Sequence, residues 1–402
     1  MKHFHDMKFS SNFNQIPISF IREILEVANN ENMISFAGGL PNPDFFPVEE
    51  LEKSAVEAFR NNGRGLLQYA GSQGYLPLRK WIARRYSSMF DAPISAENIV
   101  ITSGSQQTID IMSKLFINAG DEIIIEKPTY LGGIQAMSAY SPHFMPVDLL
   151  ADGPDLNAVE KICRQYSPKF MYAIPSFQNP SGICYSNEKR NELAALLRKY
   201  NLLMLEDDPY FELRFRGGQQ KPIFCQAPRQ VCWTGSFSKM IAPGIRLGWV
   251  ILPDELVAPF VRAKQSTDLH TNNLSQYIAY NYLTNNNIDL HLQTIRKAYR
   301  QQCTDMIKAI NTHMGNNIKM NTPDGGMFLW LKLLENIDAG ELVQKCLSKG
   351  VAFVPGKSFY TDDSGCNCIR MNFSNSPKQK IEAGIKIIAA ELKRFSIVEK
   401  SY

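Results

Sequence analysis

The sequence predicts an α/β protein, with a mostly parallel sheet sandwiched by helices in a large domain and a smaller α/β domain after it. The first observation is that short apolar runs alternate with longer amphipathic segments through the middle of the chain, as in βαβ units. The second is that one long helical pattern, residues 290–314, begins a C-terminal part of different character. The length of 402 residues suits this division.

The apolar runs of the large domain are each expected to form a strand. These strands are residues 99–102, 122–126, 169–174, 202–206, 231–234 and 247–252. A helix over 103–116 has apolar residues at helical spacing, and a second helix ends near residue 200 after a cap at Ser186 or Asn187. Strands of this apolar kind, joined through helices, indicate a sheet covered on both faces.

The smaller domain is expected to contain strands at 327–333, 351–354 and 368–373 and helices at 341–349 and 378–395. The predicted boundaries are an N-terminal arm over 1–45, the large domain over 46–285 and the small domain over 286–402. Because no low-complexity linker separates the two domains, we expect them to pack together with a ligand cleft between them.

Composition narrows the class of protein. The net charge of +4, from 43 basic and 39 acidic residues, argues against a nucleic-acid or anionic-membrane partner. No apolar run reaches the ~18 residues of a membrane-spanning helix. The start of the chain lacks a secretion signal, and the eight cysteines are scattered. The six histidines form no metal-binding motif, so we expect reduced cysteines and no metal site. The lack of a secretion signal favours a cytoplasmic location.

Four polar motifs follow predicted strands, where ligands of open α/β sheets bind. They are Ser103-Gly104-Ser105-Gln106-Gln107, Pro175-Ser176-Phe177-Gln178-Asn179-Pro180-Ser181-Gly182, Asp207-Asp208-Pro209-Tyr210 and Gly235-Ser236-Phe237-Ser238-Lys239. Taken singly, the first fits an ordinary capped helix as well as a phosphate site, and the second fits an ordinary turn. A cleft lysine at position 239, between hydroxyls, is a candidate nucleophile.

Two competing motifs fail. The S-x-x-K pattern ending at Lys239 lacks the S-D-N and K-T-G strings that a serine β-lactamase needs. The Gly356-Lys357-Ser358 string lacks the first glycine of a P-loop, since Val351 stands there.

Together, the four motifs fit one ligand, pyridoxal 5′-phosphate (PLP), which needs an imine-forming lysine, a carboxylate for the ring N–H and a phosphate cradle. The chain resembles the fold type I, class I/II aminotransferases, within them the 2-aminoadipate/kynurenine broad-specificity branch. The motifs that carry the resemblance are Gly38-Gly39-Leu40-Pro41, Gln68-Tyr69, Ser103-Gly104-Ser105-Gln106-Gln107, Lys127-Pro128-Thr129-Tyr130, Gln178-Asn179-Pro180-Ser181-Gly182, Asp207-Asp208-Pro209-Tyr210 and Ser236-Phe237-Ser238-Lys239.

The resemblance implies roles around the cofactor ring. Lys239 would form the imine with the cofactor and then act as general acid and base. Asp207, rather than Asp208, would pair with the ring N–H and keep the ring protonated. Asn179 and Tyr210 would hydrogen-bond the ring oxygen O3′.

Other residues would hold the remaining faces of the cofactor. Tyr130 would stack on the ring. The phosphate would be held by Ser105, Gln106, Ser236, Ser238 and Arg246. Tyr69 resembles the tyrosine that reaches the phosphate from a neighbouring subunit, which implies a homodimer.

The substrate would bind beside the cofactor. Arg370 would hold the α-carboxylate, with Gly39 and Asn179 alongside. Arg22, on a segment resembling the N-terminal helix that covers the active site, would read a distal carboxylate. In that case 2-aminoadipate and glutamate are favoured; neighbouring Phe20 and Ile21 would favour aromatic or aliphatic side chains instead.

The function implied is a ping-pong aminotransferase, EC 2.6.1.-, acting on an L-amino acid and a 2-oxo acid such as 2-oxoglutarate. One alternative is another PLP reaction, a β-lyase or decarboxylase, although Arg370 favours keeping the carboxylate. A second alternative is a PLP-binding sensor domain of a transcriptional regulator. It needs a DNA-binding domain ahead of Gly38, where this sequence has 37 residues.

Overall fold

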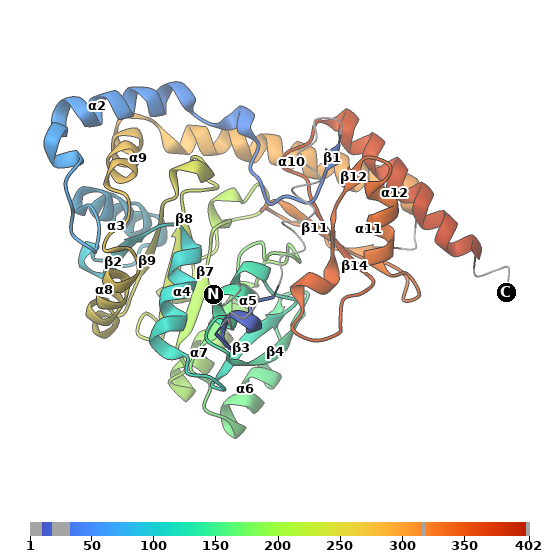
Figure 1. Cartoon of the computed structure of the whole chain (residues 1–402), viewed down its shortest axis with the longest axis horizontal. Helices are drawn as coiled ribbons and strands as arrows, with labels where there is room; N and C mark the ends of the chain where they lie inside the picture. The colour runs from blue at the N-terminus through green and yellow to red at the C-terminus, as the bar shows by residue number, and fades with distance from the viewer. Residues whose placement is uncertain (1–9, 18–32, 316–317, 399–402) are drawn as a thin grey trace, which may run out of the picture.

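The computed structural model describes residues 10–17, 33–315 and 318–398, and its largest element is an eight-stranded sheet (Figure 1). The strand order is β2-β9-β8-β7-β6-β3-β4-β5. The strands are β2 Ile99–Thr102, β3 Glu122–Lys127, β4 His143–Leu150, β5 Gly153–Pro154, β6 Met171–Ala173, β7 Met204–Asp207, β8 Val231–Ser236 and β9 Gly248–Ile251. All six strands predicted for the large domain are present.

The sheet is mostly parallel, as predicted. Strands β8, β7, β6, β3 and β4 pair in parallel, with Tyr172 opposite Leu205 and Leu205 opposite Cys232. Strand β9 runs antiparallel between β2 and β8, and β5 is antiparallel at the far edge. The parallel strands β7, β6 and β3 therefore end at one edge of the sheet, and the motifs that follow them meet there.

Helices cover both faces of this sheet. They are α3 Leu76–Phe90, α4 Ser105–Phe116, α5 Leu131–Ser138, α6 Leu156–Gln165, α7 Asn187–Tyr200, α8 Asp254–Asp268 and α9 Asn273–Asn285. Helix α2, Val48–Leu66, packs against α9. Side chains alternate along β3, so Ile123 and Ile125 join one buried apolar cluster and Ile124 joins another. Helix α7 begins where the sequence predicts, because the Ser186 hydroxyl accepts the Lys189 N–H.

A second, smaller sheet lies beside the first, and α10, Ile288–Met314, runs from one toward the other (Figure 1). Its four strands are antiparallel, in the order β10-β11-β14-β13. They are β10 Lys319–Met320, β11 Phe328–Lys332, β13 Val354–Pro355 and β14 Cys368–Asn372, with helices α11 Ala339–Leu347 and α12 Lys378–Val398 packed nearby. The strand predicted over 351–354 is divided, since β12, Val351–Ala352, belongs to a different sheet from β13.

Residues 33–39 of the chain link a separate two-stranded sheet to the small four-stranded one. Strand β1, Ile34–Ser35, pairs in parallel with β12. The backbone N–H of Asn372 then donates to Phe36 O, so residues 36–39 run from the small sheet toward the edge of the large one. Of the helices in the described part of the chain, none is long and apolar enough to cross a membrane.

Candidate active site

A cavity of about 440 Å³ lies where the strand-end motifs converge. The large sheet contributes Tyr130 after β3, Asn179 after β6, Asp207 at the end of β7 and Lys239 after β8. The small sheet contributes Arg370 from β14. The cavity therefore lies at the carboxyl ends of parallel strands, the position that ligands take in open α/β folds.

Asp207 is a buried carboxylate with one oxygen left for a ligand. Its Oδ2 accepts a hydrogen bond of 2.9 Å from the Tyr172 hydroxyl, whereas Oδ1 accepts none from any described residue. Burial raises the pKa of Asp207 to about 7, against the lowering effects of the Tyr172 hydroxyl and the nearby Ser105 hydroxyl. A cationic N–H donor placed at Oδ1 would favour the ionised form.

Asp208 faces elsewhere. It does not line the cavity, and burial together with the charge of Glu206 raises its pKa to about 8. The chain therefore presents Asp207, not Asp208, to a ligand.

Lys239 presents a basic amine to the cavity. Its Nζ donates to the Gly39 carbonyl at 2.7 Å. Burial, together with the positive charges of Arg370 and Arg246, lowers the pKa of Lys239 to about 8. A substantial fraction of the amine is therefore neutral near pH 8, as a nucleophile or base requires.

The start of α4 forms a cradle for an anion. Gly104 precedes the helix with φ +87°, and the first N–H groups of a helix have no partner within it. A Cβ at Gly104 would lie 2.9 Å from Arg246 Nη2, so glycine lets the guanidinium approach. Ser236 and Ser238 line the same cavity and add two hydroxyls.

Tyr130 and its neighbours form another wall. The Tyr130 hydroxyl lies 3.3 Å from Gln106 Oε1, to which it donates. A Cβ at Gly132 would lie 2.5 Å from the Tyr130 ring, so only glycine leaves the ring its place. The ring is thereby fixed at the cavity wall.

Arg370 is buried and held by several contacts. Its Nη1 donates to Asn179 Oδ1 at 2.8 Å, and its Nη2 donates to the Ala37 carbonyl at 2.6 Å. The guanidinium lies over the rings of Phe328 and Phe359, at 4.4 and 5.0 Å from their centroids. Burial lowers the pKa of Arg370 to about 10. Nε has no hydrogen-bond partner among the described residues, so a carboxylate would find unused donor capacity here.

Most of the site residues predicted from the sequence line this one cavity. They are Gly39, Ser105, Gln106, Tyr130, Asn179, Asp207, Tyr210, Ser236, Ser238, Lys239, Arg246 and Arg370. Tyr69 does not, because its side chain is 79% exposed and its ring stands edge-on to His270 at 5.9 Å. Arg22, with Phe20 and Ile21, lies outside the described residues.

Sequence reasoning missed several wall and support residues. Leu40, Gly132, Gln135 and Pro243 line the cavity, and Tyr172 supports Asp207 from behind. The adjacent glycines that open α5 were the available signal, since paired glycines disfavour a helix unless close packing requires them.

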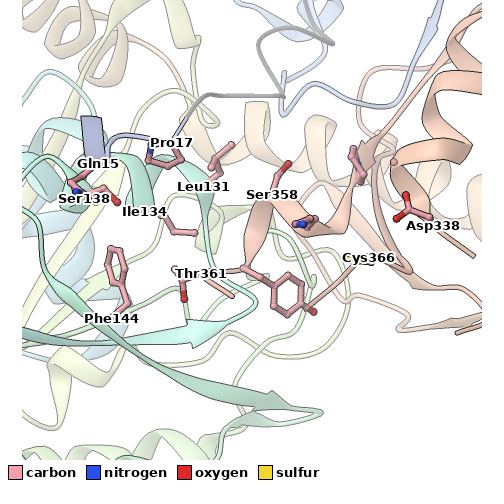
Figure 2. A pocket seen from close by; sticks show the side chains of 14 residues that line it. Gln15, Pro17, Leu131, Ile134, Ser138, Phe144, Asp338, Ser358, Thr361 and Cys366 are labelled. Carbon is pink, nitrogen blue, oxygen red and sulfur yellow. The ribbon is translucent and has the colours of Figure 1, made fainter. Parts of the chain in front are cut away.

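A second cavity of about 620 Å³ lies beyond α5. Figure 2 shows Leu131 and Ile134 of α5 among the side chains around it, with Phe144, Ser358 and Thr361. Leu131 lines both cavities, so α5 separates them. Within residues 10–17, 33–315 and 318–398, no cluster of His, Cys, Asp and Glu could hold a metal ion.

Comparison with known proteins places the chain among enzymes. The family described as aminotransferase class I and II matches residues 31–388. Aromatic-amino-acid aminotransferase 1 of Thermococcus litoralis is 37% identical over 97% of this chain and 95% of its own length. An α-aminoadipate aminotransferase structure from Thermus thermophilus, complexed with N-(5′-phosphopyridoxyl)-L-leucine, is 34% identical with a TM-score of 0.91, covering 97% of this chain and 98% of that one. Kynurenine aminotransferase of Pyrococcus horikoshii, in a complex with PMP, is 35% identical with a TM-score of 0.91, covering 96% and 97%.

Proposed function

Because the chain belongs to the class I and II aminotransferases, we propose that it transfers an amino group between an L-amino acid and a 2-oxo acid. The amino acid is 2-aminoadipate, glutamate or an aromatic one, and 2-oxoglutarate is one of the 2-oxo acids. The chain has the fold of the PLP-dependent, fold type I enzymes and falls in their broad-specificity branch. The observation that carries the proposal is the meeting of three groups in one cavity: the Lys239 amine, the unpartnered Asp207 oxygen and the Arg370 fork.

The residues of the cavity fit PLP. Asp207 Oδ1 is a buried acceptor that makes no hydrogen bond to any described residue, and the ring N–H is a donor that suits it. The cradle at the start of α4 suits the phosphate, since helix N–H groups, hydroxyls and Arg246 converge there. Tyr130 offers a ring to stack on, and Lys239 an amine for the imine.

PLP supplies an electron-withdrawing ring that stabilises negative charge at the substrate Cα. The Asp207 carboxylate would keep the ring nitrogen protonated and so strengthen that withdrawal. Lys239 Nζ would act as the base that takes the proton from the substrate Cα and then as the acid that returns it. The pKa of about 8 suits this work, because both forms of the amine are populated near that pH.

Asn179 connects the two ends of the reacting centre. Its Oδ1 accepts from Arg370 Nη1, and its Nδ2 lies 3.4 Å from the Tyr210 hydroxyl. Arg370 would hold the α-carboxylate of the substrate, while Asn179 and Tyr210 would donate to the ring oxygen of the cofactor. One amide therefore fixes the carboxylate clamp relative to the ring.

The proposed assembly is a homodimer in which Tyr69 reaches the partner's phosphate cradle. Three large exposed side chains support it, since Leu67, Tyr69 and Leu269 are 71%, 79% and 55% exposed. Leu269 directly precedes His270, whose ring meets the Tyr69 ring edge-on. Exposed apolar side chains of this size favour burial against a partner. Sedimentation of the protein should give twice the chain mass, and Tyr69→Phe should weaken cofactor affinity without dissociating the dimer.

The test is a half-reaction followed by absorbance. Purified protein loaded with PLP is mixed with L-2-aminoadipate, L-glutamate or L-tyrosine, with no oxo acid present. The visible cofactor band should be lost and then restored by 2-oxoglutarate. Release of ammonia or carbon dioxide instead would identify a β-lyase or a decarboxylase and overturn the proposal.

Arg22 is the proposed reader of a distal carboxylate. Arg22→Ala should raise KM for L-2-aminoadipate and leave KM for L-tyrosine unchanged, because only the first carries a second carboxylate. An equal effect on both substrates would remove that role.

A further inference from the structure

Tyr172 fixes one half of the Asp207 carboxylate. It lies on β6, beside β7, and is fully buried. Its hydroxyl donates to Asp207 Oδ2 at 2.9 Å and leaves Oδ1 without a partner among the described residues. We propose that Tyr172 is a positioning residue: it holds Oδ2 so that Oδ1 faces the ring nitrogen of the cofactor. This inference rests on the proposed function.

Gly133 makes room for this arrangement. It lies in α5, against the Tyr172 ring. A Cβ at Gly133 would lie 2.8 Å from Tyr172 Cε1 and 3.3 Å from its hydroxyl oxygen. Alanine there would displace the ring from its place under Asp207. Gly133 thus leaves room for the Tyr172 ring that supports Asp207, just as Gly132 leaves room for the Tyr130 ring.

The hydroxyl remains a donor under all ordinary conditions. Burial and the charge of Asp207 raise the pKa of Tyr172 well above its usual value, so the proton stays on the tyrosine. The Tyr172 hydroxyl is therefore always the donor to Asp207 Oδ2, and Oδ1 is the oxygen that can accept a hydrogen bond from a ligand.

A second buried tyrosine–carboxylate pair shows how a purely structural pair differs. The Tyr185 hydroxyl donates to Glu126 Oε1 at 2.6 Å. Glu126 Oε2 is satisfied too, by the Ile174 N–H and Gln178 Nε2, both at 3.1 Å. Glu126 has both oxygens paired inside the protein, whereas Asp207 keeps one for a ligand. Tyr185→Phe is therefore the matched control for Tyr172→Phe.

The experiment measures cofactor binding rather than turnover. Apoenzyme is titrated with pyridoxamine 5′-phosphate, which forms no covalent bond to lysine, and with its 1-deaza analogue, in which C–H replaces the ring nitrogen. Tyr172→Phe should raise Kd for pyridoxamine 5′-phosphate about tenfold, as expected for one hydrogen bond to a charged acceptor. It should leave Kd for the deaza analogue unchanged, because that analogue has nothing to donate to Asp207. Tyr185→Phe should change neither constant.

Gly133→Ala should also displace the Tyr172 ring. This variant should therefore weaken binding of pyridoxamine 5′-phosphate and leave binding of the deaza analogue unchanged. Equal losses for both ligands, or a Kd for pyridoxamine 5′-phosphate within twofold of the unmodified protein, would overturn the positioning role. Failure of the unmodified protein to bind either ligand would instead overturn the proposed function. The two failures are thus separate results.

Discussion

Replacing Arg370 with lysine tests the substrate clamp most directly. Lysine keeps the positive charge but has neither the planar fork nor the five N–H donors of arginine. In the folded chain two of those donors already serve Asn179 Oδ1 and the Ala37 carbonyl, and two phenylalanine rings flank the guanidinium plane. Lysine would have to abandon one of these partners or the substrate carboxylate.

The magnitude follows from the hydrogen bonds at stake. A bidentate clamp makes two charge-assisted hydrogen bonds to the α-carboxylate, of which lysine keeps at most one. Such a bond is worth about 1.5–3 kcal/mol. Arg370→Lys should therefore lower kcat/KM for amino acids about 10- to 150-fold. Cofactor absorbance should persist, because Arg370 contacts no residue of the phosphate cradle.

The assay is the single-turnover half-reaction, run with L-glutamate and with a primary amine that lacks the α-carboxylate. The variant should be slower with the amino acid and equal to the unmodified protein with the amine. Arg296→Lys is the matched control, since Arg296 pairs with Glu212 at 3.1 Å and does not line the cavity. An equal slowing with both substrates would refute the carboxylate role and indicate general distortion.

Three further changes have defined outcomes. Lys239→Ala should abolish both the visible cofactor band and transamination, and full turnover of the variant would contradict the assignment. In the unmodified apoenzyme, PLP attachment should slow about tenfold per pH unit below 8, because the protonated amine cannot attack. Glu126→Leu should cost at least about 3 kcal/mol in urea unfolding, since three buried donors lose their acceptor, whereas Glu126→Gln should restore most of it. Gly104→Ala, at φ +87° and 2.9 Å from Arg246 Nη2, should weaken PLP binding, while Gly218→Ala, with open space around it, should not; equal affinities would discount the cradle.

The residues that follow the strands could be predicted as site residues because ligands of open α/β sheets bind at the carboxyl ends of parallel strands. Parallel strands that share a direction end at one edge, so motifs after β3, β6 and β7 meet there whatever the details of the helices. Lys239 and the Asp207-Asp208 pair could thus be singled out from their place after predicted strands, whereas the family resemblance supplied their roles and the choice of Asp207. Arg370 was not, because the small sheet faces that edge only through tertiary packing, and the family resemblance supplied its role.

The role of Tyr172 and the division of the run 351–354 could not be predicted from local sequence patterns. Tyr172 looks like any apolar strand residue, and only the pairing of β6 with β7 brings its hydroxyl to Asp207. The run 351–354 looks like one strand, but β1 takes its first half and β14 its second. In both cases the partner lies far away in the chain, so local periodicity carries no trace of it.

The charges around Lys239 also connect substrate binding to proton transfer. The positive charge of Arg370 is the first electrostatic contribution, after burial, to the lowered pKa of Lys239. A substrate carboxylate that neutralises Arg370 removes this contribution and makes the amine a stronger base when Cα must lose its proton. Arg370→Ala should therefore raise the pKa of Lys239 in the apoenzyme, seen as an upward shift in the pH dependence of PLP attachment. The same variant should lose amino-acid turnover, because the substrate loses its carboxylate clamp. One variant would thus separate the effect of Arg370 on the pKa of Lys239 from its effect on substrate orientation.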